Sequence, residues 1–174
     1  MLTLYLLRHA KSSWDQPNIS DFDRPLAARG REAAPRMGRH MKDAAHTPEL
    51  VLCSTAVRAR QTMELVLGTL KCDPEVRMVD GLYNFGDGTG LLQIIQDAGA
   101  DYTEVMVIGH NPSLESLAVT LAGTGASADL TDMARKYPTA ALAVIEFDTD
   151  RWSDVRPGKG RLRSFTRPKA LHEA

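Results

Sequence analysis

The stretch that decides the fold is Leu2-Thr3-Leu4-Tyr5-Leu6-Leu7-Arg8-His9, at the start of the chain. Its run from 2 to 7 is dominated by apolar residues, which is typical of a β-strand covered on both faces. Comparable apolar runs occur at 49–53 and 104–109, and helical patterns lie between the runs. Alternating strands and helices predict an α/β fold: a three-layer α/β/α sandwich with a mostly parallel, mixed central sheet.

Particular residues predict where the first two helices begin and end. Pro35 lies inside the helix expected over 26–45 and should kink it or end its first part. Ser54 and Thr55 are good capping residues for a second helix that runs to about Leu70.

Later segments continue the alternation. Asn111 and Pro112 should supply the N-cap and the first residue of a helix through Leu121. Residues 123–137 are polar and mixed in character, which indicates a lid or excursion rather than a core element. Further strands are expected at Val76–Asp80, Ala140–Phe147 and Arg163–Thr166, and a further helix after the glycine-rich loop Gly86–Gly90.

The charge balance excludes one class of protein. Among 174 residues, 21 Lys and Arg nearly balance 22 Asp and Glu, giving a formal net charge of −1. This argues against a broad basic face that binds nucleic acid, but it is compatible with a small local cluster of cations. No apolar stretch approaches the roughly 20 residues that span a bilayer, so no membrane partner is expected. The length predicts a single domain over residues 1–174.

Two features predict the compartment. The short apolar N-terminus has no basic segment and no small-residue cleavage site, so we do not expect it to be a signal peptide. Cys53 and Cys72 are too few for a disulfide scaffold, and Cys53 ends an apolar run as a buried thiol would. The sequence therefore predicts a cytoplasmic protein.

Basic and titratable side chains follow three of the predicted strands. Arg8 and His9 follow the first, Arg58 lies one turn into the helix after the second, and His110 follows the strand that ends at Gly109. Because ligands of open α/β sheets collect at the carboxyl ends of the strands, we expect these four side chains to converge on one edge. No carboxylate is evident beside them, so both arginines should be uncompensated.

This set of side chains suits a phosphoryl group. Arg8 and Arg58 offer planar forks of donors that match phosphate oxygens and never lose their charge. Histidine is a competent nucleophile near neutral pH, so one histidine could attack phosphorus while the other donates to an equatorial oxygen.

Competing chemistries lack the residues that they need. No cluster has the spacing of zinc ligands, and His40 and His46 are expected to be solvent-exposed polar residues. Neither a P-loop nor a nucleophile elbow is present. The sequence therefore predicts no metal and no other cofactor.

Several segments together resemble the histidine phosphatase (phosphoglycerate-mutase-like) superfamily. Leu4-Tyr5-Leu6-Leu7-Arg8-His9-Ala10 resembles its strand and Arg-His-Gly signature, with Ala10 in place of the usual glycine, and Asp23-Arg24-Pro25-Leu26 continues the match. Ser54-Thr55-Ala56-Val57-Arg58-Ala59-Arg60-Gln61-Thr62 resembles the second arginine segment, and Val107-Ile108-Gly109-His110-Asn111-Pro112 the second histidine segment. The resemblance implies a phosphoglycerate-mutase-like fold. It also implies a catalytic, phosphate-binding pocket of Arg8, His9, Arg58 and His110, with His9 as the nucleophile.

The resemblance also leads us to look for a general acid, because many members use a Glu or Asp to protonate the leaving oxygen. Here Asn84-Phe85 and Asn111 occupy the neighbourhoods of that residue, so neither carboxylate is evident. An alkoxide needs a proton to leave, whereas a protonated imidazole leaves a phosphoramidate as a stable neutral molecule. Four other carboxylic acids could take the place of the missing general acid: Asp15, Asp21, Asp23 and Asp87. For each of them we favour a turn-stabilising or solvated role.

The absent acid favours P–N over P–O cleavage, and the short chain also resembles the small SixA-type phosphohistidine phosphatase branch. We therefore expect a phosphatase that acts through phospho-His9, with protein phosphohistidine as its substrate. Two alternatives stay open: a broad phosphomonoesterase of small phosphorylated molecules, and a non-catalytic module that binds phosphate groups. The sequence leaves the partner protein and the oligomeric state open.

Overall fold

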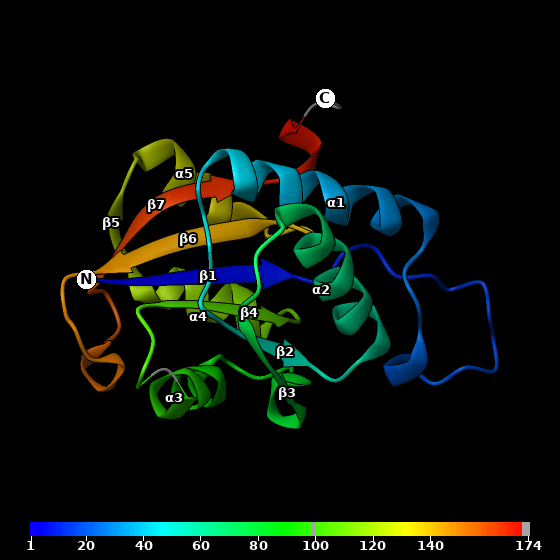
Figure 1. Ribbon diagram of the computed structural model, residues 1–174, viewed down its shortest axis with the longest axis horizontal. Helices are drawn as coiled ribbons and strands as arrows, with labels where there is room; N and C mark the ends of the chain where they lie inside the picture. Colours follow the sequence, from blue (N-terminus) through cyan, green and yellow to red (C-terminus); the bar gives the residue numbers. More distant parts are fainter. Residues whose placement is uncertain (99, 172–174) are drawn as a thin grey trace.

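The computed structural model describes residues 1–98 and 100–171. Strands and helices alternate along these residues as predicted (Figure 1). The strands are β1 (Leu2–Arg8), β2 (Leu50–Ser54), β3 (Glu75–Val79), β4 (Glu104–Gly109), β5 (Ala122–Gly125), β6 (Leu142–Phe147) and β7 (Gly160–Thr166). The α-helices are α1 (Ala28–Asp43), α2 (Val57–Leu70), α3 (Thr89–Ala98), α4 (Ser113–Leu121) and α5 (Ser127–Arg135). Short 3-10 helices occur at η1 (Asp21–Asp23), η2 (Asp80–Leu82), η3 (Trp152–Asp154) and η4 (Pro168–Ala170).

One sheet contains the strands in the order β3-β2-β4-β1-β6-β7-β5. β1, β2, β3 and β4 pair in parallel, and β5 pairs in parallel with β7. β6 runs antiparallel to both of its neighbours, β1 and β7. The predicted α/β fold with a mostly parallel, mixed sheet is therefore confirmed.

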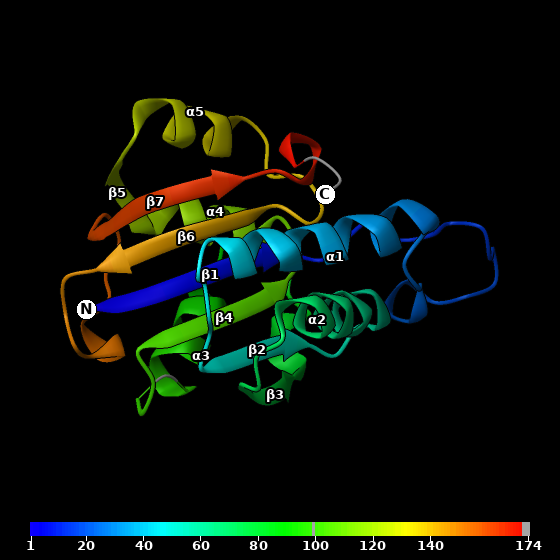
Figure 2. The same ribbon diagram turned by 45° about the horizontal axis from the view of Figure 1, so that its top comes forward.

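Helices cover both faces of the sheet (Figure 2). On one face, Tyr5 and Leu7 belong to the same buried cluster as Met37 of α1. On the other face, Leu4 and Leu6 belong to the cluster that contains residues of α3, α4 and α5. Because successive strand residues point to opposite faces, a strand buried on both faces needs apolar residues at nearly every position. That requirement explains the long apolar run of β1.

The register brings together the strand ends that carry the predicted site. Arg8 pairs with Gly109, and the N–H of His9 donates to the carbonyl of Gly109 at 3.1 Å. On the other side of β1, the N–H of Arg8 donates to the carbonyl of Ala141 at 3.1 Å. The carboxyl ends of β1 and β4 therefore lie beside the segment that leads into β6.

Of the two effects expected of Pro35, a kink or an end to the first part of the helix, the second is wrong. α1 continues from Ala28 to Asp43 with Pro35 inside it. Buried side chains on both sides of the proline, Ala34 and Met37 among them, pack into the core. This packing holds the helix together despite the hydrogen bond that proline cannot donate.

Both predicted helix caps are wrong in detail. α2 begins at Val57 after Ala56, and no side chain caps it. Ser54 instead bonds a histidine of the site, as described below. α4 begins at Ser113, one residue later than expected, and Asn111 Oδ1 accepts a bond from the N–H of Glu115 at 3.3 Å.

The segment 123–137 is not a lid. Most of β5 and all of α5 fall within it, and β5 pairs with β7 at the edge of the sheet. Met133 of α5 is buried in the core on that face. The polar residues of the segment reflect its position at the sheet edge, where one side of each element meets solvent.

Glycine at position 30 permits a close approach of two segments. Gly30 lies in the first turns of α1, and a Cβ built on it would lie 2.2 Å from the carbonyl oxygen of Lys11. The same oxygen accepts a hydrogen bond from the N–H of Ala27 at 2.9 Å. α1 therefore packs directly against the backbone that follows His9.

The two ends of the described chain lie at different edges of the sheet (Figure 2). The ammonium group of Met1 pairs with Asp150 at 2.9 Å, at the end of β1 away from His9. Leu171 follows η4 and packs against the cluster that contains residues of α1 and α2. None of the helices in the described residues is both long enough and apolar enough to cross a membrane.

Candidate active site

A pocket of about 250 Å³ lies at the carboxyl edge of the sheet, and all four predicted site residues line it. Arg8 and His9 come from the end of β1, Arg58 is the second residue of α2, and His110 follows β4. The other lining residues are Lys11, Ser12, Trp14, Asp21, Arg24, Phe85, Asn111 and Thr139. The structure thus brings together the four side chains that the strand ends predicted.

His9 is held in one tautomer. Its ring is buried, and Nδ1 lies 2.7 Å from the carbonyl oxygen of Ala10. A carbonyl only accepts hydrogen bonds, so Nδ1 carries the proton and Nε2 keeps its lone pair. Arg58 Nε–H faces that Nε2 at 3.4 Å. Burial lowers the pKa of His9 to about 3 despite the bond to Ala10, so the ring is neutral near pH 7.

His110 lies next to His9, with 5.1 Å between the ring centroids. Ser54 Oγ accepts a bond from the N–H of Ala56 at 3.3 Å and lies 2.7 Å from His110 Nε2. The hydroxyl can therefore donate its own hydrogen to Nε2, and we assign the ring proton to Nδ1. Burial, followed by the charge of Arg58, lowers the pKa of His110 to about 3.

Two buried donors of pocket-lining residues have no partner among the described residues. Arg8 Nη1 donates to the carbonyl of Tyr137 at 3.0 Å, but Arg8 Nε is buried and unpartnered. His110 Nδ1 is also buried and unpartnered. Buried donors in native proteins nearly always find an acceptor, so this pair indicates a site for a ligand rich in acceptor oxygens.

Arg58 is not the uncompensated arginine that we expected. Its Nη2 lies 3.1 Å from Asp21 Oδ2, and its Nη1 donates to the Asp21 carbonyl at 2.7 Å. Arg24 pairs with the other carboxylate oxygen at 3.0 Å, and the Tyr83 hydroxyl donates to Oδ2. Partial burial would raise the pKa of Asp21, but the bonds from Tyr83, Arg24 and Arg58 lower it to about 2. Asp21 is therefore an ionised carboxylate at neutral pH.

The other acids considered as stand-ins lie elsewhere. Asp15 is exposed and lines a separate surface hollow with residues 16–19. Asp23 accepts a bond from the Ser20 hydroxyl, and Asp87 accepts bonds from Thr89 at the start of α3. These two stabilise turns, as expected. Among the residues lining the pocket, Asp21 alone is a carboxylic acid.

Two residues to which the sequence assigned no role, Arg24 and Thr62, complete the site. Arg24 is buried, and its guanidinium lies 3.6 Å above the ring of Trp14. Thr62 accepts a bond from the N–H of Ala10 at 2.9 Å and donates to the Arg58 carbonyl at 2.7 Å, which ties α2 to the loop after His9. Arg24 and Thr62 lie within segments that resemble the superfamily, and that resemblance is the signal that could have identified them.

The remaining candidate residues lie outside the pocket. His40 and His46 are half-buried rather than solvent-exposed, with 6.4 Å between their ring centroids. In residues 1–98 and 100–171, no group of three or more His, Cys, Asp or Glu side chains could hold a metal ion. Cys53 is buried as expected, and burial raises the pKa of its thiol to about 12.

Comparisons with known proteins agree with this geometry. The model of the histidine phosphatase superfamily (branch 1) matches residues 4–94. An uncharacterised protein of Mycobacterium tuberculosis strain H37Rv, Rv1276c, is 36% identical over 165 residues, which cover 94% of this chain and 100% of the relative.

Solved structures share the fold. A candidate phosphohistidine phosphatase, SixA, from Agrobacterium tumefaciens is 31% identical, with a TM-score of 0.79 over 96% of this chain and 98% of that one. The protein histidine phosphatase SixA, solved with tungstate, is 24% identical, with a TM-score of 0.77 over 97% and 98% of the two chains. The chain belongs to branch 1 of the histidine phosphatase superfamily, and its fold is that of the SixA structures.

Proposed function

We propose that this protein is a phosphatase that transfers a phosphoryl group to His9 Nε2 and then to water, and that its substrate is a phosphohistidine carried by a protein. The similarity to the A. tumefaciens protein, a candidate phosphohistidine phosphatase, supports this substrate class. The His9 ring is neutral, and its bond to Ala10 leaves the lone pair on Nε2. Both features support the covalent step.

The pocket residues hold the phosphoryl group. Arg8 Nε and His110 Nδ1, which have no partner among residues 1–98 and 100–171, donate to its oxygens. Arg58 Nε, 3.4 Å from His9 Nε2, donates to an oxygen close to the attacking nitrogen. Donors fixed in a buried pocket stabilise the charge that develops in the transition state without reorganising.

The first step exchanges one P–N bond for another. His9 Nε2 attacks phosphorus in line while the bond to the substrate's imidazole breaks. A substrate ring that carries a proton then departs as neutral imidazole. His9 Nδ1 keeps its proton, which it donates to the carbonyl of Ala10, so phospho-His9 is positively charged on its ring.

The second step returns the enzyme to its starting state. Water attacks phosphorus, the bond to Nε2 breaks, and the proton of the water passes to phosphate or solvent. His9 leaves as neutral imidazole because Nδ1 has kept its proton, so this step also needs no acid to protonate the leaving group.

One observation carries the choice of P–N over P–O cleavage. Asp21 alone among the lining residues is a carboxylic acid, and its partners hold it ionised, with a pKa of about 2. A carboxylate in that state has no proton to give to an alkoxide. The pocket is therefore equipped to expel a leaving group that already carries its proton.

The test compares wild type with His9→Ala, and with His40→Ala as a matched histidine variant outside the pocket. Each protein is incubated with a phosphohistidine protein and, separately, with an aryl phosphate. We expect a phosphoryl label that is labile in acid and stable in base on wild type and on His40→Ala. We expect no such label on His9→Ala. Phosphohistidine should turn over faster than aryl phosphate.

The outcomes separate the alternatives. Labelling with fast aryl phosphate hydrolysis and no phosphohistidine turnover would identify a small-molecule phosphomonoesterase. Binding of phosphate without label or turnover would identify a non-catalytic module. Arg58→Ala should lower turnover by about 100-fold or more, because a donor to the transition state is lost; a near-normal rate would refute its role.

A further inference from the structure

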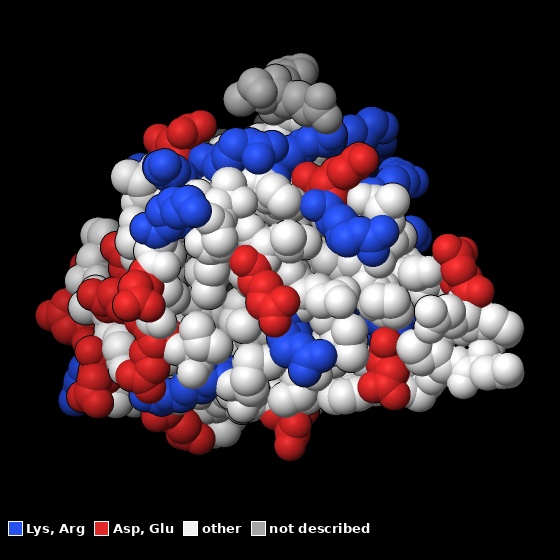
Figure 3. Space-filling model, turned by 45° about the vertical axis from the view of Figure 1, so that its right-hand side comes forward, with Lys and Arg blue, Asp and Glu red and all other residues white. Residues whose placement is uncertain are grey.

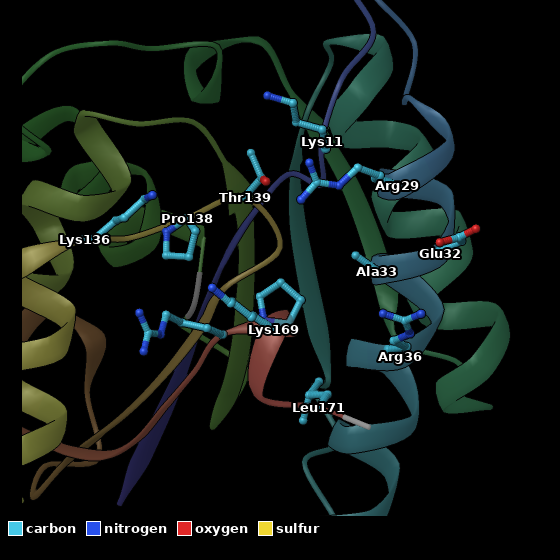
Figure 4. A pocket seen from close by; sticks show the side chains of 12 residues that line it. Lys11, Arg29, Glu32, Ala33, Arg36, Lys136, Pro138, Thr139, Lys169 and Leu171 are labelled. Carbon is cyan, nitrogen blue, oxygen red and sulfur yellow. The ribbon is translucent and has the colours of Figure 1, made fainter. Parts of the chain in front are cut away.

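A second, larger hollow lies beside the catalytic pocket. It has a volume of about 600 Å³ and lies between α1, the segment before β6 and the start of η4 (Figure 4). Its charged residues are mostly cations, and we call it the basic groove. It is lined by Lys11, Arg29, Glu32, Ala33, Arg36, Lys136, Pro138, Thr139, Arg167, Pro168, Lys169 and Leu171.

Most of the positive charge in the basic groove is not neutralised locally. Lys11, Arg29, Lys136 and Lys169 are exposed and form no ion pair with any residue in 1–98 or 100–171. Arg167 differs, because its Nε lies 3.2 Å from Asp132. Lys and Arg also gather along the top of the face drawn in Figure 3. The groove is thus a concentrated positive surface on a protein whose net charge is −1.

The basic groove continues from the catalytic pocket. Lys11 and Thr139 line both hollows. Figure 4 shows these two residues at one end of the groove, with Arg29 beside them and Lys136 and Lys169 further along. A substrate that extends from the catalytic pocket past Lys11 and Thr139 would therefore enter the groove.

We propose that the basic groove binds acidic residues that flank the phosphohistidine in the substrate protein. This inference rests on the proposed function and adds a recognition element to it. A phosphohistidine within a protein always brings flanking chain to the pocket mouth, whereas a small phosphate ester does not. Long, exposed Lys and Arg side chains can adjust to carboxylates in several positions, and a positive groove steers an acidic partner toward the site.

The lining argues against a nucleotide as the occupant. No aromatic side chain lines the basic groove, so it offers no stacking platform for a base. Four of its cations are exposed rather than fixed by buried partners, unlike the ordered donors of a small-ligand site. Its apolar part, Ala33, Pro138, Pro168 and Leu171, suits the stems of peptide side chains.

The test uses two phosphohistidine peptides of equal length, one flanked by Glu and one by Gln. We expect wild type to show a kcat/KM about three- to tenfold higher for the Glu peptide, mainly through a lower KM. High salt should remove this preference because the groove cations are exposed. Lys136→Gln/Lys169→Gln should remove it too, while leaving hydrolysis of free phosphohistidine unchanged.

The matched control is Arg39→Gln/Lys42→Gln, which removes two exposed charges of α1 that do not line the basic groove. This variant should keep the preference for the Glu peptide. Equal kcat/KM for both peptides in wild type would overturn the groove proposal. An equal loss of the preference for the Glu peptide in both double variants would overturn it too. Binding of ATP that competes with neither peptide but is lost in Lys136→Gln/Lys169→Gln would overturn the proposal and identify the groove as a nucleotide site. Failure to hydrolyse any phosphohistidine substrate would overturn the proposed function itself.

Discussion

At the scale of single residues, Asp21 connects three side chains of the site. Its carboxylate pairs with Arg58 and Arg24 and accepts a hydrogen bond from the Tyr83 hydroxyl. The side chain is nevertheless half exposed, at 47%, so solvent can replace some of these contacts. An incoming phosphoryl group would compete with this carboxylate for the guanidinium of Arg58.

Asp21→Asn should therefore strengthen anion binding. The substitution keeps the shape of the side chain but removes the negative charge that competes for Arg58. We expect the dissociation constant for tungstate or inorganic phosphate, measured by calorimetry, to fall about three- to tenfold. Asp87→Asn, at an exposed turn, serves as the control and should leave binding unchanged. Weaker binding in Asp21→Asn would show that the carboxylate positions Arg58 rather than competing for it.

The sequence predicted the four basic side chains of the site because each follows a strand. Arg8, His9 and His110 are placed by backbone pairing between β1 and β4, which a strand pattern reveals. Asp21 could not be found in this way. It reaches Arg58 through a long loop and a single 3-10 turn, η1, which has no apolar periodicity to fix its path.

At the scale of elements, α1 lines the basic groove with one side while its buried residues pack on the core. Its buried residues include Gly30 and Gly38, and a Cβ on Gly38 would lie 2.7 Å from the carbonyl oxygen of Val66 in α2. These glycines let the backbone of α1 approach its neighbours closely. The helix therefore fixes the position of the loop that begins with Lys11.

Gly30→Ala should destabilise the protein and slow turnover together. The new Cβ would meet backbone atoms of Lys11, which cannot move without shifting the segment after His9. We expect a loss of about 1–3 kcal/mol in the free energy of unfolding, measured with urea. Gly68→Ala in α2 is the matched control: nothing lies within 4 Å of its Cβ, so it should stabilise by up to about 1 kcal/mol. Wild-type stability in Gly30→Ala would contradict the close packing of these segments.

Element types were predictable, while element ends were less so. Apolar runs identified β1, β2 and β4 because their residues are buried on both faces. Ser54 failed as a helix cap because its hydroxyl binds His110, a tertiary contact that no local pattern encodes. α1 likewise passes through Pro35 because tertiary packing outweighs the local cost of proline.

At the scale of the whole molecule, the two buried histidines link the site to global stability. The pKa of both His9 and His110 is about 3 in the folded state, against 6.5 for an unperturbed histidine. Between pH 6.5 and 3, the unfolded chain takes up protons at these positions and the folded chain does not. The free energy of unfolding therefore falls as the pH falls through this window. Above the window, neither group makes the free energy of unfolding depend on pH.

We expect the free energy of unfolding to fall by up to about 1.4 kcal/mol per pH unit for each histidine below pH 6.5. Urea unfolding at a series of pH values should show a shallower pH dependence for His9→Gln/His110→Gln than for wild type. His40→Gln provides a comparison for a half-buried histidine outside the pocket. The same slope in wild type and the double variant would contradict the assignment of two neutral, buried rings.

The total charge predicted the absence of a broad nucleic-acid surface but not where the charge lies. Arg29 and Arg36 belong to a run of cations along the first helix. In the structure, both line the basic groove. The groove that they line is closed on another side by η4. This element follows the last strand and could not be placed against α1 from sequence alone. The assignment of residues 1–174 to one domain stays a prediction.

The placement of the chain ends has a practical consequence for handling the molecule. Met1 lies at the end of β1 away from His9, whereas Leu171 lines the basic groove. A surface tether or affinity tag attached before Met1 would leave both hollows facing the medium. One attached on the C-terminal side would follow Leu171 at the groove and, on the groove proposal, suppress capture of acidic partners. Pull-down or biosensor work on this protein should therefore immobilise it by its N-terminus.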